Sequence, residues 1–144
     1  MEELQEKTLN PEVKETLIVS ESKTPFSELD ENVKLALHCA AEKKGVNISV
    51  LDLRDITSFS EFFIITSGTN QRQVQAICDE INEQLKKQLS QKAIRIEGYT
   101  TAEWVLMDYG DFIVHIFDQK ARQFYDLERL WRDARKVELP NDTI

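Results

Sequence analysis

The sequence predicts a mixed α/β (α+β) domain in which helices pack on a single mixed sheet of about five strands. Three observations support this prediction. The chain has 144 residues, enough for one hydrophobic core, and its 41% hydrophobic and 31% charged composition is typical of globular domains. Short β-branched and aromatic runs are interspersed with longer segments of helical periodicity. Only a tight turn separates the last two of these runs, which requires an antiparallel pair.

The first predicted helix covers residues 25–45. Ser27 is its expected N-cap, with Asp30 three residues later, and Gly45 follows two lysines as a stop signal. Its apolar residues recur at helical spacing, at Leu29, Val33, Leu37 and Ala40. A second helix is predicted over residues 69–89, with a similar stripe at Val74, Ile77, Ile81 and Leu85.

Strands are predicted where β-branched and aromatic residues cluster between turn residues, over 46–53, 62–67, 92–99, 102–108 and 112–118. A last helix over residues 124–137 closes the chain. Its inward-facing residues are expected to be Leu127, Leu130, Trp131 and Ala134. The resulting order, α-β-β-α-β-β-β-α, favours one mixed sheet over separate helical and sheet domains.

The charge pattern divides the chain into an arm and a folded domain. Residues 1–25 are predicted to form a flexible acidic arm, residues 26–139 the folded domain and residues 140–144 a short tail. Residues 1–31 hold nine acids and three lysines, so they contribute −6 of the net charge of −8. A broad basic face for sequence-specific nucleic-acid binding is therefore not expected, whereas a basic protein partner fits this charge.

The composition also bears on the cellular compartment. No apolar stretch reaches the ~18 residues of a membrane helix, and the acidic start of the chain resembles neither a secretory signal nor an Arg-rich transit peptide. Cys39 and Cys78 fall inside predicted helices, as expected of reduced core residues. We therefore expect a cytoplasmic protein with no membrane partner.

The hairpin over residues 102–120 has two faces of different character. With Tyr109-Gly110 as the turn, Asp108 is expected to face Asp111 and Trp104 to face His115. The core face is wholly apolar: Val105, Met107, Phe112, Val114 and Ile116. The second face mixes apolar and charged residues: Trp104, Leu106, Asp108, Asp111, Ile113, His115 and Phe117.

Two interpretations of this second face stay open. A helix of the same chain can cover it, or it can dock a partner, since tryptophan is enriched in binding hot spots and exposed apolar patches mark interfaces. Opposed carboxylates repel each other unless a cation lies nearby. From Glu97 to Asp118 the sequence has five acids and no lysine or arginine, so a basic partner is expected to supply the cations.

Signals for catalysis or metal binding are weak. Ser67-Gly68 lies between a strand and a helix, where backbone amides can bind phosphate, but a capped helix start using Ser67, Thr69 or Asn70 is the better interpretation. Asp52, Asp55 and Glu97 do not form the paired acids of a nucleotidyl-transfer site. His38 and Cys39 are adjacent on a helix and cannot form an i, i+4 metal pair. No catalytic residue, metal or cofactor is expected.

Three blocks of sequence resemble the ribosomal silencing factor (RsfS, or Iojap) family: LDLRDITSFSEFFIITSGTNQRQVQAI, EGYTTAEWVLMDYGDFIVHIF and ARQFYDLERLW. They span roughly residues 28–137 in the family's order, and Glu61 stands where the family more often has aspartate. The resemblance implies a fold like that of nucleotidyltransferases without the catalytic acids. It further implies that the protein binds the large ribosomal subunit through a ribosomal protein of the L-fourteen family. The bound protein is then expected to block joining of the two subunits and so to repress translation. The resemblance also implies homodimers.

The same resemblance implies which residues contact the partner. They are Trp104, Leu106, Asp108, Tyr109 and His115, followed by Lys120, Arg122 and Tyr125. Trp104 and Leu106 are expected to anchor in an apolar depression, and Asp108, with Asp111 or Glu97, to pair with basic side chains. Arg122 can equally form a structural bridge to Asp118 or Asp126. An enzyme with an atypical nucleotidyl- or phosphoryl-transfer site and a plain oligomerisation domain are the alternatives.

Overall fold

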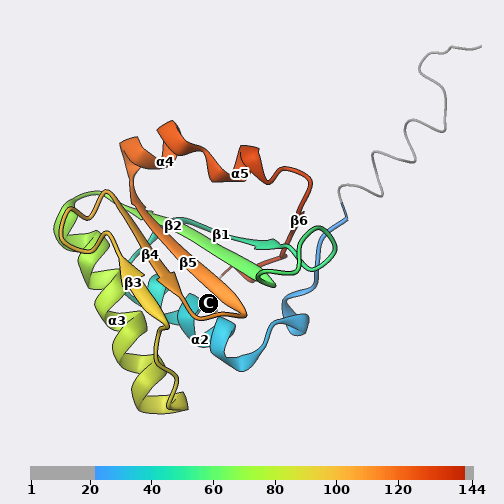
Figure 1. Cartoon of the computed structure of the whole chain (residues 1–144), viewed down its shortest axis with the longest axis horizontal. Coiled ribbons are helices and arrows are strands. Elements are labelled where there is room, and N and C mark those ends of the chain that lie inside the picture. The colour runs from blue at the N-terminus through green and yellow to red at the C-terminus, as the bar shows by residue number, and fades with distance from the viewer. Residues whose placement is uncertain (1–21, 142–144) are drawn as a thin grey trace, which may run out of the picture.

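One mixed sheet of six strands separates two helical layers in the computed structural model, which describes residues 22–141 (Figure 1). The strands are β1 (Val46–Asp52), β2 (Phe62–Gly68), β3 (Arg95–Glu97), β4 (Trp104–Asp108), β5 (Phe112–Asp118) and β6 (Arg135–Lys136). The helices are the short 3₁₀ turn η1 (Phe26–Glu28), α2 (Glu31–Glu42), α3 (Gln71–Leu89), α4 (Gln119–Tyr125) and α5 (Leu127–Leu130). The predicted mixed sheet with flanking helices is confirmed, with β6 as an additional strand.

The sheet order is β3-β4-β5-β2-β1-β6. All neighbouring strands are antiparallel except β2 and β5, which are parallel. A parallel pair requires a long crossover, and the chain between β2 and β5 supplies it as α3 followed by the β3–β4 hairpin. This connection places the hairpin at the edge of the sheet (Figure 1).

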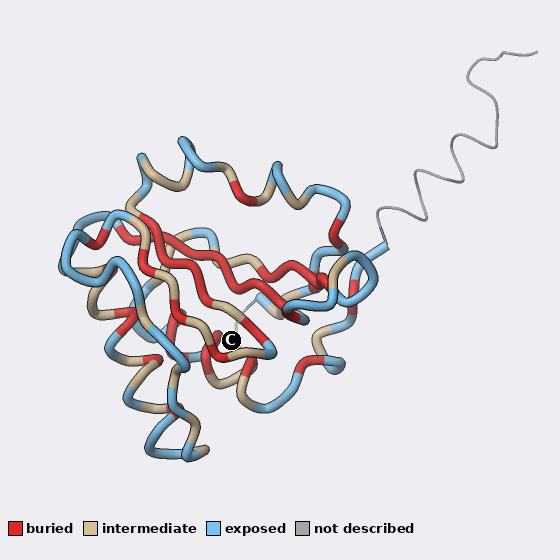
Figure 2. Tube along the Cα trace, viewed as in Figure 1, coloured by how far each residue is buried: buried red, intermediate tan, exposed pale blue. Residues whose placement is uncertain are grey.

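The first face of the sheet is buried under α2 and α3 (Figure 1). Both predicted apolar stripes are buried there, and so are the five predicted core residues of the β4–β5 hairpin. Figure 2 shows the continuous burial of the central strands. Cys39 and Cys78 are free, buried thiols in this core, as predicted, and burial raises their pKa to about 11 and about 12.

The two long helices differ in how well their starts were predicted. Asn70 caps α3, because its side-chain oxygen accepts a hydrogen bond from the Gln73 amide at 2.8 Å. The predicted N-cap at Ser27 is wrong. Residues 26–28 form the separate turn η1, Leu29 is extended, and α2 begins after Asp30. Leu29 is nevertheless buried in the same core.

The β4–β5 register differs from the predicted one by two residues. Trp104 pairs with Phe117, Leu106 with His115 and Asp108 with Ile113, so Asp108 does not face Asp111. The turn residues are Gly110, with a φ of 87°, and Asp111, instead of Tyr109 and Gly110. A shift of two residues preserves the alternation of side chains, so the predicted faces are confirmed for the residues of β4 and β5, whereas Asp111 lies in the turn and not on the second face.

The predicted C-terminal helix over residues 124–137 is wrong in extent. Asp118 caps α4 by accepting a hydrogen bond from the Ala121 amide at 2.7 Å, which starts the helix at residue 119. Asp126 adopts a left-handed conformation with a φ of 47° and separates α4 from α5. Leu127 and Ala134 face inward as predicted, but the side chain of Leu130 is 71% exposed.

The folded domain begins before the predicted boundary at residue 25. Thr24 is fully buried and forms an isolated parallel bridge with Val137. Its hydroxyl donates a hydrogen bond of 2.6 Å to Asp52. The remainder of the predicted acidic arm, residues 1–21, lies outside the described residues, as do residues 142–144 of the predicted tail.

Candidate partner-binding face

The second face of the sheet is only partly covered by the chain's own helices. A smaller apolar cluster under α4 and α5 buries the part that belongs to β1, β2 and the end of β5, including Leu51, Phe63, Ile65 and Phe117. At the β4 side, Trp104, Leu106 and Ile113 are each only half-buried. Helices of the same chain therefore cover one half of this face, as the first interpretation expects, and leave the β4 side accessible, where docking of a partner stays a prediction.

Trp104 lies at the boundary between the covered and the open part. Its ring packs against Tyr125 of α4 at a centroid distance of 4.7 Å and against Phe117 at 5.0 Å. The indole Nε1–H donates a hydrogen bond of 3.0 Å to Nδ1 of His115. The indole is therefore fixed in orientation by its own chain while part of its surface stays accessible, which is the preorganisation expected of an interface anchor.

His115 supports this tryptophan from inside the molecule. Its side chain is 3% exposed, and burial lowers its pKa to about 4, so the imidazole is neutral near pH 7. Because Nδ1 accepts the indole hydrogen bond, the ring proton lies on Nε2, which has no hydrogen-bond partner among the described residues. The burial corrects the predicted direct contact with a partner, since His115 offers no accessible side chain.

Tyr109 is also removed from the predicted contact set. It is buried on the α2–α3 side of the sheet, where its ring stacks on Phe112 at a centroid distance of 4.9 Å. Burial raises the pKa of its hydroxyl, which has no hydrogen-bond partner among the described residues. Tyr109 therefore belongs to the hydrophobic core between the sheet and helices α2 and α3.

Asp108 has cationic and amide partners within its own chain. One carboxylate oxygen accepts a hydrogen bond of 2.8 Å from the Gly110 amide, and the other lies 3.5 Å from Nε of Arg95. The same Arg95 nitrogen lies 3.5 Å from Glu97. The expectation that a partner must supply the cation for Asp108 is therefore wrong, because β3 places Arg95 directly opposite Asp108.

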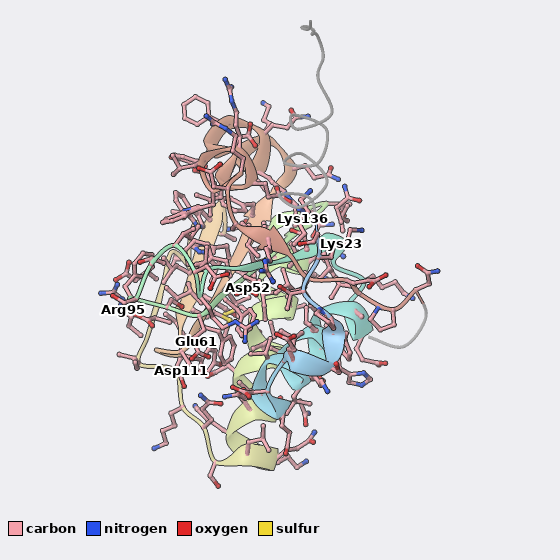
Figure 3. All side chains as sticks on the ribbon, turned by 90° about the vertical axis from the view of Figure 1, so that its right-hand side faces the viewer. Lys23, Asp52, Glu61, Arg95, Asp111 and Lys136 are labelled. Carbon is pink, nitrogen blue, oxygen red and sulfur yellow. The ribbon has the colours of Figure 1, made fainter. Side chains whose placement is uncertain are left out.

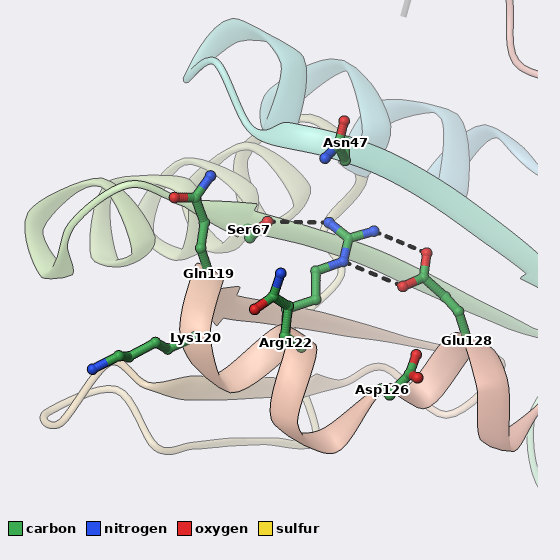
Figure 4. A pocket seen from close by; sticks show the side chains of 8 residues that line it. Asn47, Ser67, Gln119, Lys120, Arg122, Asp126 and Glu128 are labelled. Carbon is green, nitrogen blue, oxygen red and sulfur yellow. Dashed lines mark hydrogen bonds and ion pairs between the residues drawn. The ribbon is translucent and has the colours of Figure 1, made fainter.

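Arg122 is a structural residue in this fold. Its side chain is 13% exposed, and Nη1 donates hydrogen bonds to the Val46 carbonyl at 3.0 Å and to Oγ of Ser67 at 3.1 Å. Nε and Nη2 form a bidentate pair with Glu128 at 3.3 and 2.9 Å (Figure 4). This partner replaces both predicted ones, Asp118 and Asp126.

The Arg122 cluster ties α4 and α5 to the ends of β1 and β2. Burial by itself would raise the pKa of Glu128, but hydrogen bonds from Arg122 and Ser49 outweigh it and lower that pKa. The cluster forms one wall of an open polar hollow of about 730 Å³ (Figure 4). The guanidinium that lines this hollow already has oxygen partners for each of its nitrogens, so it is poorly suited to bind a further anion.

The remaining predicted residues lie on α4, beside the open part of the sheet. Lys120 is exposed, and Tyr125 is 49% exposed while packing on Trp104. Phe124 is 80% exposed and contacts the Tyr125 ring at a centroid distance of 5.0 Å. The sequence prediction missed Phe124, although an aromatic pair directly before the acidic DLE segment was a usable signal.

The acidic residues considered for an enzymatic site lie far from one another and form hydrogen bonds or ion pairs with other residues of the fold. Asp52 accepts hydrogen bonds from Arg54 and Thr24, and these bonds outweigh the opposing effect of burial and lower its pKa to about 2. Glu97 lies on β3, four strand positions from β1, which corresponds to about 19 Å at ~4.8 Å per strand. Asp52 and Glu97 therefore cannot share a metal ion. Among residues 22–141, no group of three or more His, Cys, Asp or Glu is placed to hold a metal.

None of the helices within residues 22–141 has the length and apolar character needed to cross a bilayer.

Comparison with known proteins identifies close relatives. The family model described as "Ribosomal silencing factor during starvation" matches residues 27–143. A protein named ribosomal silencing factor RsfS from Halalkalibacterium halodurans is 41% identical over 112 residues, which cover 76% of this chain and 92% of that protein. Its counterpart of the same name in Bacillus subtilis is 37% identical over 107 residues, covering 74% and 90%.

Solved structures and a plant protein extend the similarity. The crystal structure of protein CV0518 from Chromobacterium violaceum superimposes with a TM-score of 0.70 at 32% identity, covering 81% of this chain and 93% of that chain. A structure from Bacillus halodurans gives a TM-score of 0.66 at 37% identity, covering 76% and 98%. The chloroplastic protein Iojap of Zea mays is 38% identical over 105 residues, covering 72% of this chain and 45% of that protein.

Proposed function

The chain belongs to the ribosomal silencing factor family, and from this premise we propose that it binds the large ribosomal subunit through a ribosomal protein of the L-fourteen family. Its place on the subunit is the face that meets the small subunit. Occupation of that face prevents the two subunits from joining and represses translation in the cytoplasm. The mechanism is steric occlusion, so it requires affinity and bulk and no catalysed reaction.

The observation that carries this proposal is the half-open second face beside α4. We define the docking face as Trp104, Leu106, Asp108, Lys120, Phe124 and Tyr125. Its aromatic residues are clustered and partly exposed, and the hydrogen bond to His115 fixes the central indole. Aromatic side chains held in this way lose little conformational entropy on binding and are enriched among interface hot spots.

Charge around the docking face favours a basic partner. Glu97, Glu103 and Asp111 are exposed, and Asp118 is half-buried at the start of α4. Arg95 offsets this charge next to Asp108 and Glu97. A surplus of carboxylates at the rim of an apolar patch speeds encounter with a cationic surface and disfavours acidic competitors.

Three residues named by the resemblance have supporting roles in this proposal. His115 orients Trp104, Tyr109 fills the core beneath the hairpin, and Arg122 holds α4 against the sheet. Substitution of any of them is expected to weaken binding because the side chains of the docking face are displaced, and not because a contact with the partner is lost.

The experiment that tests the proposal measures subunit joining. Large subunits are incubated with the protein, small subunits are added, and the joined fraction is measured by sedimentation. The intact protein is expected to keep the subunits apart, and Tyr125→Ala to lose that effect. Tyr99→Ala is the matched control, because Tyr99 is a similarly exposed tyrosine bonded to Asp79 of α3 on the other side of the sheet. Equal inhibition by both variants would refute this use of the docking face.

The resemblance further implies homodimers, and we propose that self-association is separable from ribosome binding. The mass of the protein in solution, measured alone and with the isolated ribosomal protein, decides this. A 1:1 complex with the ribosomal protein formed from a dimer would mean that both partners use the same surface.

A further inference from the structure

We propose that the edge of the molecule formed by β6 and the end of α5 binds RNA, through contacts of four cationic side chains with backbone phosphates. This basic edge consists of Lys23, Arg129, Arg132 and Lys136. On the large subunit it is a second contact, made with ribosomal RNA next to the ribosomal protein that the docking face binds. The affinity for RNA is a property of the basic edge alone, whereas its use on the subunit rests on the proposed function.

The four cations of the basic edge are exposed, and none of them forms an ion pair with another residue of the described chain. The exposed acids nearest to them in sequence, Asp133 and Glu138, form no such pair either. Residues 119–136 hold six cations and three acids, a balance of +3, so the rest of a chain with a net charge of −8 carries −11. The basic edge is therefore a local positive surface on an acidic protein.

The N-terminal end of the described chain brings one of these cations to β6. Thr24 and Val137 form a parallel bridge, and the Thr24 amide donates a hydrogen bond of 2.9 Å to the Lys136 carbonyl. The residues before the bridge, Lys23 and Lys136, therefore lie side by side, as Figure 3 shows. Two lysines from opposite ends of the domain thus meet at one edge of the sheet.

The two arginines extend this edge along the C-terminal layer. Nη1 of Arg132 donates a hydrogen bond of 3.5 Å to the Arg129 carbonyl, which holds its guanidinium against the end of α5. Lys136 lies on the same side of the sheet, since its charge contributes to the lowered pKa of Glu128 in α5. One helical turn from Arg129 to Arg132 and four further residues to Lys136 make a row of at most roughly 20 Å.

An extended row of cations fits an extended polyanion better than a single small anion. Each strand of a nucleic acid carries a phosphate about every 3.4 Å of helix axis, so a row of this length meets several phosphates. The planar guanidinium groups of Arg129 and Arg132 match phosphate oxygens in a bidentate way. No member of the basic edge is aromatic, so the contact positions the protein on RNA without reading its sequence.

The basic edge and the docking face open toward the same side of the molecule. Helices α4 and α5 form one layer on the face of the sheet opposite α2 and α3, and α4 contributes to the docking face (Figure 1). Arg129 follows Tyr125 by four residues, so at most about 14 Å separates their backbones. An interface of standard size buries about 800 Å² per partner and is roughly 30 Å across. One docked orientation therefore brings both surfaces against the same particle.

The salt dependence of binding to large subunits tests this second contact. For the full-length variant Arg129→Gln/Arg132→Gln, the slope of log affinity against log salt concentration is expected to fall by about 1.4–1.8, because each phosphate contact contributes about 0.7–0.9. The advantage of the intact protein over this variant then falls roughly tenfold between about 50 and 200 mM salt. Lys86→Gln/Lys87→Gln is the matched control, because it removes the same charge from exposed positions on α3 and should keep the slope of the intact protein. Equal slopes for the two variants would overturn the inference.

Isolated partners separate an RNA contact from a protein contact. Both variants should bind the isolated ribosomal protein as tightly as the intact protein does, and weaker binding by the arginine variant would mean that the basic edge contacts that protein instead. In nuclear magnetic resonance spectra at low salt, a short RNA duplex should move the amide signals of residues 129–136 and leave those of β4 in place. Unmoved signals at residues 129–136 would refute the proposal.

Polyglutamate of the same length should bind at least about tenfold more weakly than the duplex, which has two charged strands. Equal binding of polyglutamate would assign the basic edge to an acidic protein segment and so refute the RNA contact. Failure of the proposed function gives a different result. If the intact protein does not bind large subunits while the duplex moves the signals of residues 129–136, the proposed function fails and the RNA contact stands.

Discussion

Replacement of Trp104 by alanine separates folding from docking most clearly. The indole forms two close ring contacts, with Tyr125 and Phe117, and one hydrogen bond to buried His115. Each aromatic pair contributes about 0.5–1.5 kcal/mol beyond buried area, and loss of a partner for a buried polar atom costs about 1–3 kcal/mol. The expected loss of folding stability is therefore about 2–6 kcal/mol, a large fraction of the ~5–15 kcal/mol of a typical domain.

The binding loss is expected to be separate from this loss of stability. Truncation of an interface hot spot costs ~2–4 kcal/mol, which corresponds to a roughly thirtyfold to nearly thousandfold weaker complex. Urea denaturation followed by circular dichroism gives the first quantity, and co-sedimentation with large subunits under conditions where the variant is folded gives the second.

Trp131→Ala is the matched control for this substitution. Trp131 is also half-buried and contacts two rings, Phe59 and Phe63. It lies at the end of α5, however, whereas Trp104 packs against Tyr125 of α4. Trp131→Ala is expected to lose comparable stability without weaker binding. Undiminished binding by folded Trp104→Ala would refute the assignment of the indole as the anchor. If Trp104→Ala is unfolded even without urea, docking is measured with the variant Trp104→Phe instead.

Three further substitutions test the supporting structure. Burial lowers the pKa of His115 from 6.5 to about 4, so between these pH values the unfolded chain binds a proton that the folded chain does not. The stabilising effect of neutral His115 is therefore complete above about pH 6.5, and the free energy of unfolding falls by up to about 3 kcal/mol toward pH 4. His115→Gln should flatten that part of the pH profile of stability measured by urea denaturation. Arg122→Ala should lower the free energy of unfolding by about 2–4 kcal/mol, because it leaves Glu128 half-buried without its cation. In denaturation experiments the double variant Arg122→Met/Glu128→Leu should recover much of this loss. If the two single substitutions instead have additive effects in the double variant, the pairing is contradicted. Gly98→Ala should lower stability by more than about 1 kcal/mol, measured by thermal unfolding, because Gly98 has a φ of 82° and a Cβ there would collide with the Trp104 carbonyl oxygen; an unchanged melting temperature would contradict this reasoning.

Periodicity predicted the parts of the fold that depend on burial. The stripes on α2 and α3 and the two faces of the β4–β5 hairpin follow from periods of 3.6 and 2.0, which leave a strong signal in sequence. Gly110 marked the turn correctly, but it can occupy either central position, and the choice of the wrong one displaced the register by two residues.

The remaining differences arise from local geometry and distant partners. Nothing in the sequence marks Asp126 as left-handed in the way a glycine would, so the break between α4 and α5 was missed, and with it the exposure of Phe124 and Leu130. The pairing of Arg122 with Glu128, Ser67 and Val46 depends on which strands lie beneath α4. The two-residue strand β6 is too short to show a period.

Hydrogen exchange of the full-length protein, alone and bound to large ribosomal subunits, tests the central claim most directly. Docking through the second face predicts slower exchange in β4 around Trp104 and Leu106 and in α4 around Tyr125, with the amides of α2 and α3 unchanged. Slower exchange confined to α2 and α3, with β4 and α4 unaffected by the subunit, would contradict the account.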